Sequence, residues 1–194
     1  MVRYNSHVMI RNLKRMTAVA LCATALVSMT AGCVPQGLAV GDTQATEPAI
    51  QHDGVDVSDA IVIYIGSQDT SVDRPIVNAL QSSGLDTAYM SMEGLDAQAA
   101  NRAIIDATNR NLSAVMIGPN NVNQWTEGLK TAREAGYPVV LVDPTDTVTV
   151  DETLYAAIFH VVDGSDAAAT SIFDATIQII DDHAHDKTMD VKLG

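Results

Sequence analysis

Short aliphatic segments alternate with amphipathic ones through most of this chain, and no other feature constrains its fold as strongly. Residues 60–66 form a β-branched run that ends in glycine, typical of a strand buried on both faces. Four later strands are expected: a weaker one over 87–92, and clearer ones over 114–118, 138–143 and 156–162. Strands separated by single helices predict an α/β fold of three layers, doubly wound around a mostly parallel sheet of about five strands.

Apolar residues at helical spacing fill the gaps between these strands. Gly84 is expected to end the first helix, and Asp96 is expected to cap the second. Trp125 lies on the apolar stripe of the third helix, where we expect it to pack in the core. The predicted helices cover 72–83, 96–109, about 125–136, and a last segment capped by Ser165 or Asp166.

The first 32 residues differ in charge and hydropathy from the remainder. They carry basic residues and no Asp or Glu, and residues 16–29 form an apolar run. That run is shorter than the roughly 20 residues that a membrane-spanning helix needs. The layout predicts a secretory signal peptide over 1–32. Without it, the formal charge of −13 becomes near −17, because all 24 acidic residues lie beyond this segment.

Ala31-Gly32-Cys33 resembles the bacterial lipobox, although Thr30 stands where that motif usually has Leu. The resemblance implies that Cys33 is acylated and anchors the chain to the cell membrane on its extracytoplasmic side. Cys22 would leave with the signal peptide. The alternative is an ordinary secreted protein in which Cys33 is a thiol near the cleavage site.

The residues after Cys33 contain Pro and Gly without a sustained apolar period. They predict a flexible tether over 33–59 and a folded domain over 60–194.

Composition and motifs exclude several functions. The acidic charge argues against nucleic acid, because neutralising phosphates takes clustered Lys and Arg. The chain has no Gly-x-Ser-x-Gly, phosphate-loop or Gly-x-Gly-x-x-Gly pattern, so we expect no enzyme, cofactor or metal. Residues 181–186, with two His among carboxylates, have metal-like chemistry but also fit a solvated helix end.

Polar residues follow four of the predicted strands. Ligands of open α/β sheets bind beyond the carboxyl ends of the strands. Helix caps and turns favour the same residue types, so the pattern also fits a purely structural role. The segments are 66–70, 119–121, 143–146 and 163–166.

The segment 96–143 resembles the amino-terminal lobe of type I periplasmic sugar-binding proteins, which feed ABC importers. The resemblance rests on 114–119 and on the helix ending Ala-Gly before Pro-Val-Val and Asp143, and it extends weakly over 60–182. It implies a small-molecule ligand, which is a sugar in that family, and an ABC permease as partner. It also implies that Asp143, Asp163, Gln68 and Asp69 bind the ligand.

Several departures from that family leave a second function open. Pro144 replaces the usual Arg, Gly164 replaces the usual Asn, and the first loop, 67–74, has no aromatic residue. The length fits a single lobe of a protein that closes around its ligand with two, as if the chain were truncated. The sequence therefore predicts either a solute-binding lipoprotein or a ligand-free, degenerate surface module that pairs with another chain.

Overall fold

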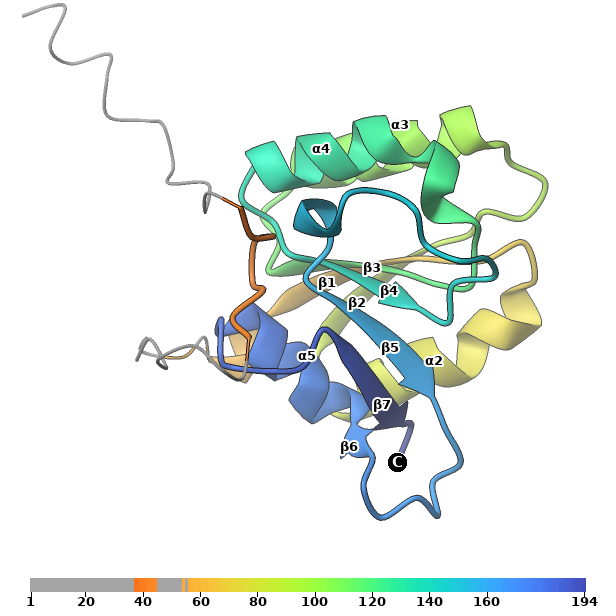
Figure 1. Cartoon of the computed structure of the whole chain (residues 1–194). Helices are drawn as coiled ribbons and strands as arrows, with labels where there is room; N and C mark the ends of the chain where they lie inside the picture. The colour runs from red at the N-terminus through yellow and green to blue at the C-terminus, as the bar shows by residue number, and fades with distance from the viewer. Residues whose placement is uncertain (1–36, 45–53, 55) are drawn as a thin grey trace, which may run out of the picture. The chain divides into compact units, whose positions relative to one another are not determined.

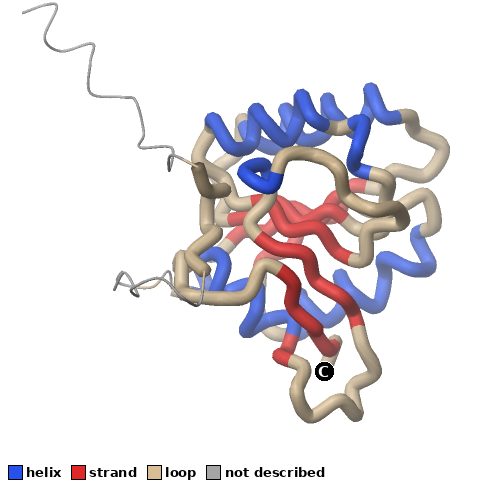
Figure 2. The backbone as a smooth tube through the Cα atoms, in the orientation of Figure 1, coloured by secondary structure: helices blue, strands red, loops and turns tan. Residues whose placement is uncertain are grey.

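The protein has a seven-stranded sheet in which every neighbouring pair of strands is parallel (Figures 1 and 2). The computed structural model describes residues 37–44, 54 and 56–194. The order is β2-β1-β3-β4-β5-β7-β6. The strands are β1 (Ile61–Ile65), β2 (Asp86–Met90), β3 (Ala114–Ile117), β4 (Val139–Val142), β5 (Ala157–Val161), β6 (Thr170–Ser171) and β7 (Thr188–Lys192). The helices are α2 (Thr70–Ser82), α3 (Ala97–Thr108), α4 (Thr126–Glu134) and α5 (Ile172–Ile180), with 3₁₀ turns η1 (Val57–Asp59), η2 (Val122–Gln124) and η3 (Glu152–Leu154).

The central strands are buried on both faces, which explains their unbroken aliphatic character. Alternate residues point to opposite sides of a strand. Tyr64 and Met116 join the core beneath α2 and α5, whereas Ile63 and Ile117 join the core beneath α3 and α4. Figure 1 shows these two helix pairs on opposite faces of the sheet. The predicted three-layer, doubly wound α/β fold is confirmed.

The direction of each crossover decides which face its helix covers. Right-handed connections place helices on opposite faces when the chain steps in opposite directions along the sheet. The steps from β1 to β2 and from β6 to β7 run one way, and α2 and α5 share one face. The steps into β3 and β4 run the other way, and α3 and α4 share the other face. The direction therefore switches between β1 and β3.

The sheet differs from the prediction at its far side. It has two more strands than the expected five. β6 has only two residues, and β7 has one buried residue, Val191, and no aliphatic run that would mark a strand. The expected cap of the last helix was wrong as well. Ser171 caps α5 by accepting the Asp174 N–H at 3.0 Å, whereas Ser165 and Asp166 lie in the preceding loop.

The predicted signal peptide, 1–32, and Cys33 lie outside the described residues. Within the predicted tether, 33–59, residues 33–36, 45–53 and 55 also lie outside the described residues, so flexibility there stays a prediction. Residues 37–44 are described and are largely buried against the domain, which does not fit a flexible tether. Within the described ranges, no helix is long and apolar enough to cross a membrane.

Candidate functional site

A pocket of about 220 Å³ opens where the loops after β1 and β3 part toward opposite faces of the sheet. This is the switch point at which open α/β sheets bind ligands. Its polar walls come from three loops and its apolar wall from residues of the α3/α4 core. The lining residues are Gln68, Met92, Leu95, Asp96, Ala97, Asn120, Asn121, Gln124 and Trp125.

Gln68 spans the mouth of this pocket from the β1 loop to the β2 loop. Its Nε2 donates to the Leu95 carbonyl at 2.9 Å, and its Oε1 accepts the Gly94 N–H at 3.1 Å. Both contacts are exposed. A ligand can therefore compete for this amide without leaving a buried group unpaired.

Asn120 forms the floor on the β3 side. It is buried, and its Nδ2 donates to the carbonyls of Gly66 and Gly118 at 2.9 and 3.1 Å. The amide thus ties the carboxyl end of β1 to that of β3. Its backbone carbonyl accepts the Thr145 N–H at 3.2 Å, which holds the β4 loop beside the pocket.

Trp125 gives the pocket an aromatic wall. The side chain is 4% exposed and packs in the α3/α4 core, as predicted. It also lines the pocket with Met92 and Leu95, and this second role was missed. Helical spacing identified the buried face of Trp125, but the pocket depends on how η2 turns the chain before α4.

Of the four predicted ligand-binding residues, Gln68 lines this pocket, and Asp69, Asp143 and Asp163 are not among its lining residues. Asp69 caps α2, where the Ser71 hydroxyl and backbone N–H lower the pKa of Asp69. Asp163 makes a turn by accepting the Ser165 N–H at 3.0 Å. A ligand-binding role for each stays a prediction.

Asp143 lies at the end of β4 in the left-handed region, with φ 43°. Its carboxylate accepts the Val161 N–H at 3.2 Å and lies 3.5 Å from His160 Nδ1. Both side chains are partly exposed. They form a polar pair at the carboxyl edge, over β4 and β5.

A buried polar cluster supports the β1 loop from the α2 side. The Asp73 carboxylate accepts the Ser67 N–H and the Tyr89 hydroxyl, the latter at 2.9 Å. The Tyr64 hydroxyl lies nearby, and among the described residues it has no hydrogen-bond partner. Burial, followed by the Asp73 charge, raises the pKa of Tyr64.

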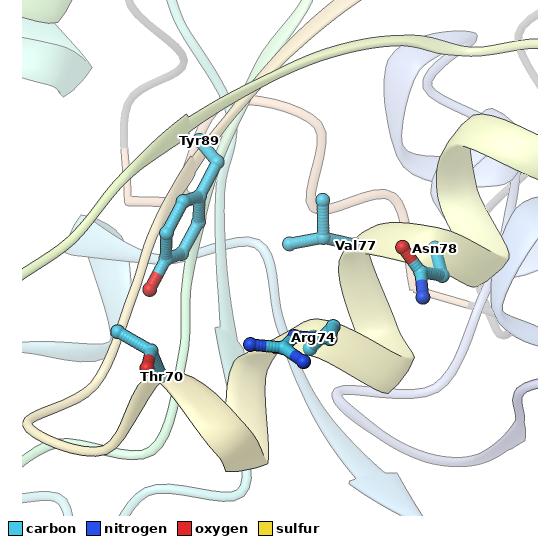
Figure 3. Close-up of a pocket in the computed structure, with 5 residues that line it drawn as sticks. All are labelled: Thr70, Arg74, Val77, Asn78 and Tyr89. Carbon is cyan, nitrogen blue, oxygen red and sulfur yellow. The ribbon is translucent and has the colours of Figure 1, made fainter.

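A second pocket, of about 160 Å³, lies between α2 and the edge strand β2. Figure 3 shows Thr70, Arg74, Val77 and Asn78 from α2 and Tyr89 from β2 around it. The two pockets share no lining residue. Among the described residues, no group of three or more His, Cys, Asp or Glu is arranged to hold a metal ion.

The tail 181–186 is used for packing. His185 is buried, with Nε2 2.8 Å from the Gly41 carbonyl and Nδ1 2.9 Å from the Asp186 carbonyl. The interpretation of this segment as a solvated helix end was therefore wrong for His185.

No family model matches the chain, and no curated protein matches it. Three solved structures are similar to part of it. One is from Mycobacterium smegmatis, in complex with β-D-fucofuranose (18% identity, TM-score 0.46, 53% of this chain and 34% of that one). Another is an ABC sugar transporter subunit from Rhodobacter sphaeroides (14% identity, TM-score 0.45, 54% of this chain and 36% of that one). The third is the periplasmic binding protein component of an arabinose ABC transporter from Shewanella, bound to α- and β-L-arabinofuranose (21% identity, TM-score 0.43, 52% of this chain and 34% of that one). The chain spans about a third of the length of these structures.

Proposed function

We propose that this chain is a solute-binding lipoprotein that takes a small polyhydroxylated ligand, a sugar, into the switch-point pocket. The observation that supports this best is the composition of that pocket. It combines the amides of Gln68 and Gln124 with the ring of Trp125. Amides both donate to and accept from hydroxyl groups. The small part of the Trp125 ring that reaches the pocket, in a residue 4% exposed, offers an apolar contact for the C–H groups of a sugar.

The size of the pocket favours a monosaccharide. Its volume of about 220 Å³ is below the roughly 300–1,000 Å³ common for drug-sized ligands. The resemblance noted in the sequence implies the same ligand class.

We also propose that the protein acts by binding rather than by catalysis. Asp96 is the carboxylate among the lining residues, and its Oδ1 accepts the Ala99 N–H at 2.8 Å as the cap of α3. A carboxylate held in a cap is poorly placed to move a proton on a ligand. An ABC permease is the partner that this function implies.

The lipid anchor belongs to the same proposal. Basic residues, an apolar run and small residues before Cys33 support acylation of that cysteine. The domain would then lie on the extracytoplasmic side of the cell membrane.

Trp125 provides the test, because it is the single tryptophan of the chain and it lines the pocket. Purified protein is titrated with D-galactose, D-ribose, L-arabinose and D-xylose while tryptophan fluorescence and thermal unfolding are recorded. A ligand that binds the native state shifts both. Flat responses to all four sugars at millimolar concentration would reject sugar binding.

A matched pair of variants locates the site. Gln124→Ala removes an exposed amide from the pocket, whereas Gln178→Ala removes a partly exposed amide from α5 on the opposite face. Loss of one or two hydrogen bonds to the ligand weakens binding about tenfold for Gln124→Ala. Gln178→Ala should bind like the parent chain. Equal affinities for both variants would place the ligand elsewhere.

A further inference from the structure

Residues 37–44, which we name the strap, pack against the folded domain although they belong to the predicted tether. Ala39, Asp42 and Thr43 are 3%, 6% and 5% exposed. Burial of this degree is typical of a docked segment and not of a solvated linker. Figure 1 shows the strap in orange, on the side of the sheet where the strands begin.

The middle of the strap is fixed by His185. The His185 backbone N–H donates to the Thr43 carbonyl at 2.8 Å, and Nε2 lies 2.8 Å from the Gly41 carbonyl. Gly41 has φ +72°, and a Cβ there would lie 2.8 Å from the Ile179 carbonyl oxygen. The chain passes so close to α5 that a side chain at Gly41 does not fit.

A lysine fixes the next residue of the strap. Lys187 Nζ pairs with the Asp42 carboxylate and donates to the carbonyls of Glu152 and Tyr155 at 3.0 and 2.6 Å. The ammonium also lies 4.5 Å from the centre of the Tyr155 ring. Such a largely buried, fully hydrogen-bonded ion pair fixes geometry. Lys187 and Tyr155 lie just before β7 and β5, respectively.

The first residues of the strap are held at the same edge of the sheet. Arg133 lies in the last turn of α4, and its Nη2 donates to the Leu38 carbonyl at 3.1 Å. Pro138, which comes directly before β4, lies against Gly41. All these contacts lie at the amino ends of parallel strands. The switch-point pocket lies at the carboxyl ends, on the opposite edge of the sheet.

We propose that the strap orients the domain on the membrane, with the amino edge of the sheet facing the lipid surface and the pocket facing away from it. The proposal rests on the lipid anchor at Cys33 proposed above. Only residues 34–36 separate that cysteine from Gly37. At no more than about 3.6 Å per residue, four residues of fully extended chain reach about 14 Å.

This reach is short compared with the domain. A domain of roughly 150 residues has a radius of gyration of about 15 Å, so it is at least about 30 Å across. A tether that reaches less than half of this width, attached at the amino edge, does not let the carboxyl edge turn to the membrane. The pocket is therefore presented to solvent, where a dissolved ligand enters it.

The orientation is measured on the full chain in membrane vesicles from the cells that express it. Acylated Cys33 cannot react with thiol reagents and Cys22 leaves with the signal, so one introduced cysteine takes up the label. Glu134→Cys places a fluorophore near the strap, and Glu93→Cys places it near the pocket. Both residues are exposed. Lipids carrying a spin label on the headgroup then quench a fluorophore that lies at the membrane surface.

We expect several-fold stronger quenching at position 134 than at position 93. A flexible glycine–serine segment inserted after Gln36 lengthens the reach without touching the fold, and it should abolish the difference. Equal quenching at the two positions in the parent chain overturns the orientation while leaving the anchor intact. A chain that washes off the vesicles overturns the anchor and, with it, the orientation.

Discussion

Both carboxylate oxygens of Asp73 accept the backbone N–H of Ser67, at 2.9 and 2.8 Å. Asp73 is 1% exposed and lies in the first turn of α2. The contact therefore ties the start of this helix to the loop that follows β1. Because Gln68 follows Ser67 directly, the contact also fixes where the Gln68 side chain enters the switch-point pocket.

Replacing Asp73 with Asn should loosen this loop. The amide offers one acceptor oxygen, and in either orientation its NH₂ group faces the Ser67 N–H. We expect the free energy of unfolding to fall by about 1–3 kcal/mol, as for other buried groups that lose a partner. Urea unfolding measures the change. Asp86→Asn, on the exposed start of β2, serves as control and should change little; equal losses would assign the effect to net charge.

The two tyrosines beside Asp73 should respond in opposite directions to loss of the hydroxyl. Tyr64→Phe removes a buried hydroxyl that has no hydrogen-bond partner among the described residues, so stability should stay the same or rise by up to about 1 kcal/mol. Tyr89→Phe removes the donor to Asp73 and should cost about 1–2 kcal/mol. Urea unfolding of the two variants tests the contrast. A loss for Tyr64→Phe as large as that for Tyr89→Phe would show that the Tyr64 hydroxyl is bonded in solution.

Stability should also fall at alkaline pH. Burial and then the Asp73 charge raise the pKa of Tyr64 above its ordinary 10.0, and burial and the bond to Asp73 raise the pKa of Tyr89. The folded state then holds these protons more tightly than the unfolded state. Their contribution is complete below about pH 10 and is lost as the pH rises above it. Urea unfolding from neutral pH upward should show this decline, and Tyr64→Phe should make it shallower; an unchanged slope would contradict the assignment.

Local sequence patterns predicted the fold class and most strands and helices, but they could not predict contacts between residues far apart in the sequence. Asp96 was recognised as the cap of α3 because a cap depends on the next three residues. Asn120 was among the polar residues expected at the carboxyl edge, since it directly follows a clear strand. The strap could not be predicted, because its bond between Gly41 and His185 joins residues 144 positions apart. A ligand-binding role for Asp143 stays a prediction. The contact of its carboxylate with the N–H of Val161 on the next strand depends on a left-handed backbone conformation that the sequence did not reveal.

Two glycines at strand ends should differ sharply in their tolerance of a methyl group. A Cβ on Gly118 would lie 2.6 Å from the Tyr64 hydroxyl and 3.0 Å from Asp73 Oδ1, so Gly118→Ala pushes a fixed tyrosine against a buried carboxylate. We expect a loss of about 1–3 kcal/mol, typical of overpacking. Gly164→Ala meets one atom, the Gly194 carbonyl oxygen, at an ordinary 3.6 Å and should change stability by less than about 0.5 kcal/mol. Thermal and urea unfolding of both variants measure the two changes in stability. A Gly118→Ala variant as stable as the parent chain would mean that the Tyr64 ring can move aside to accommodate the methyl group.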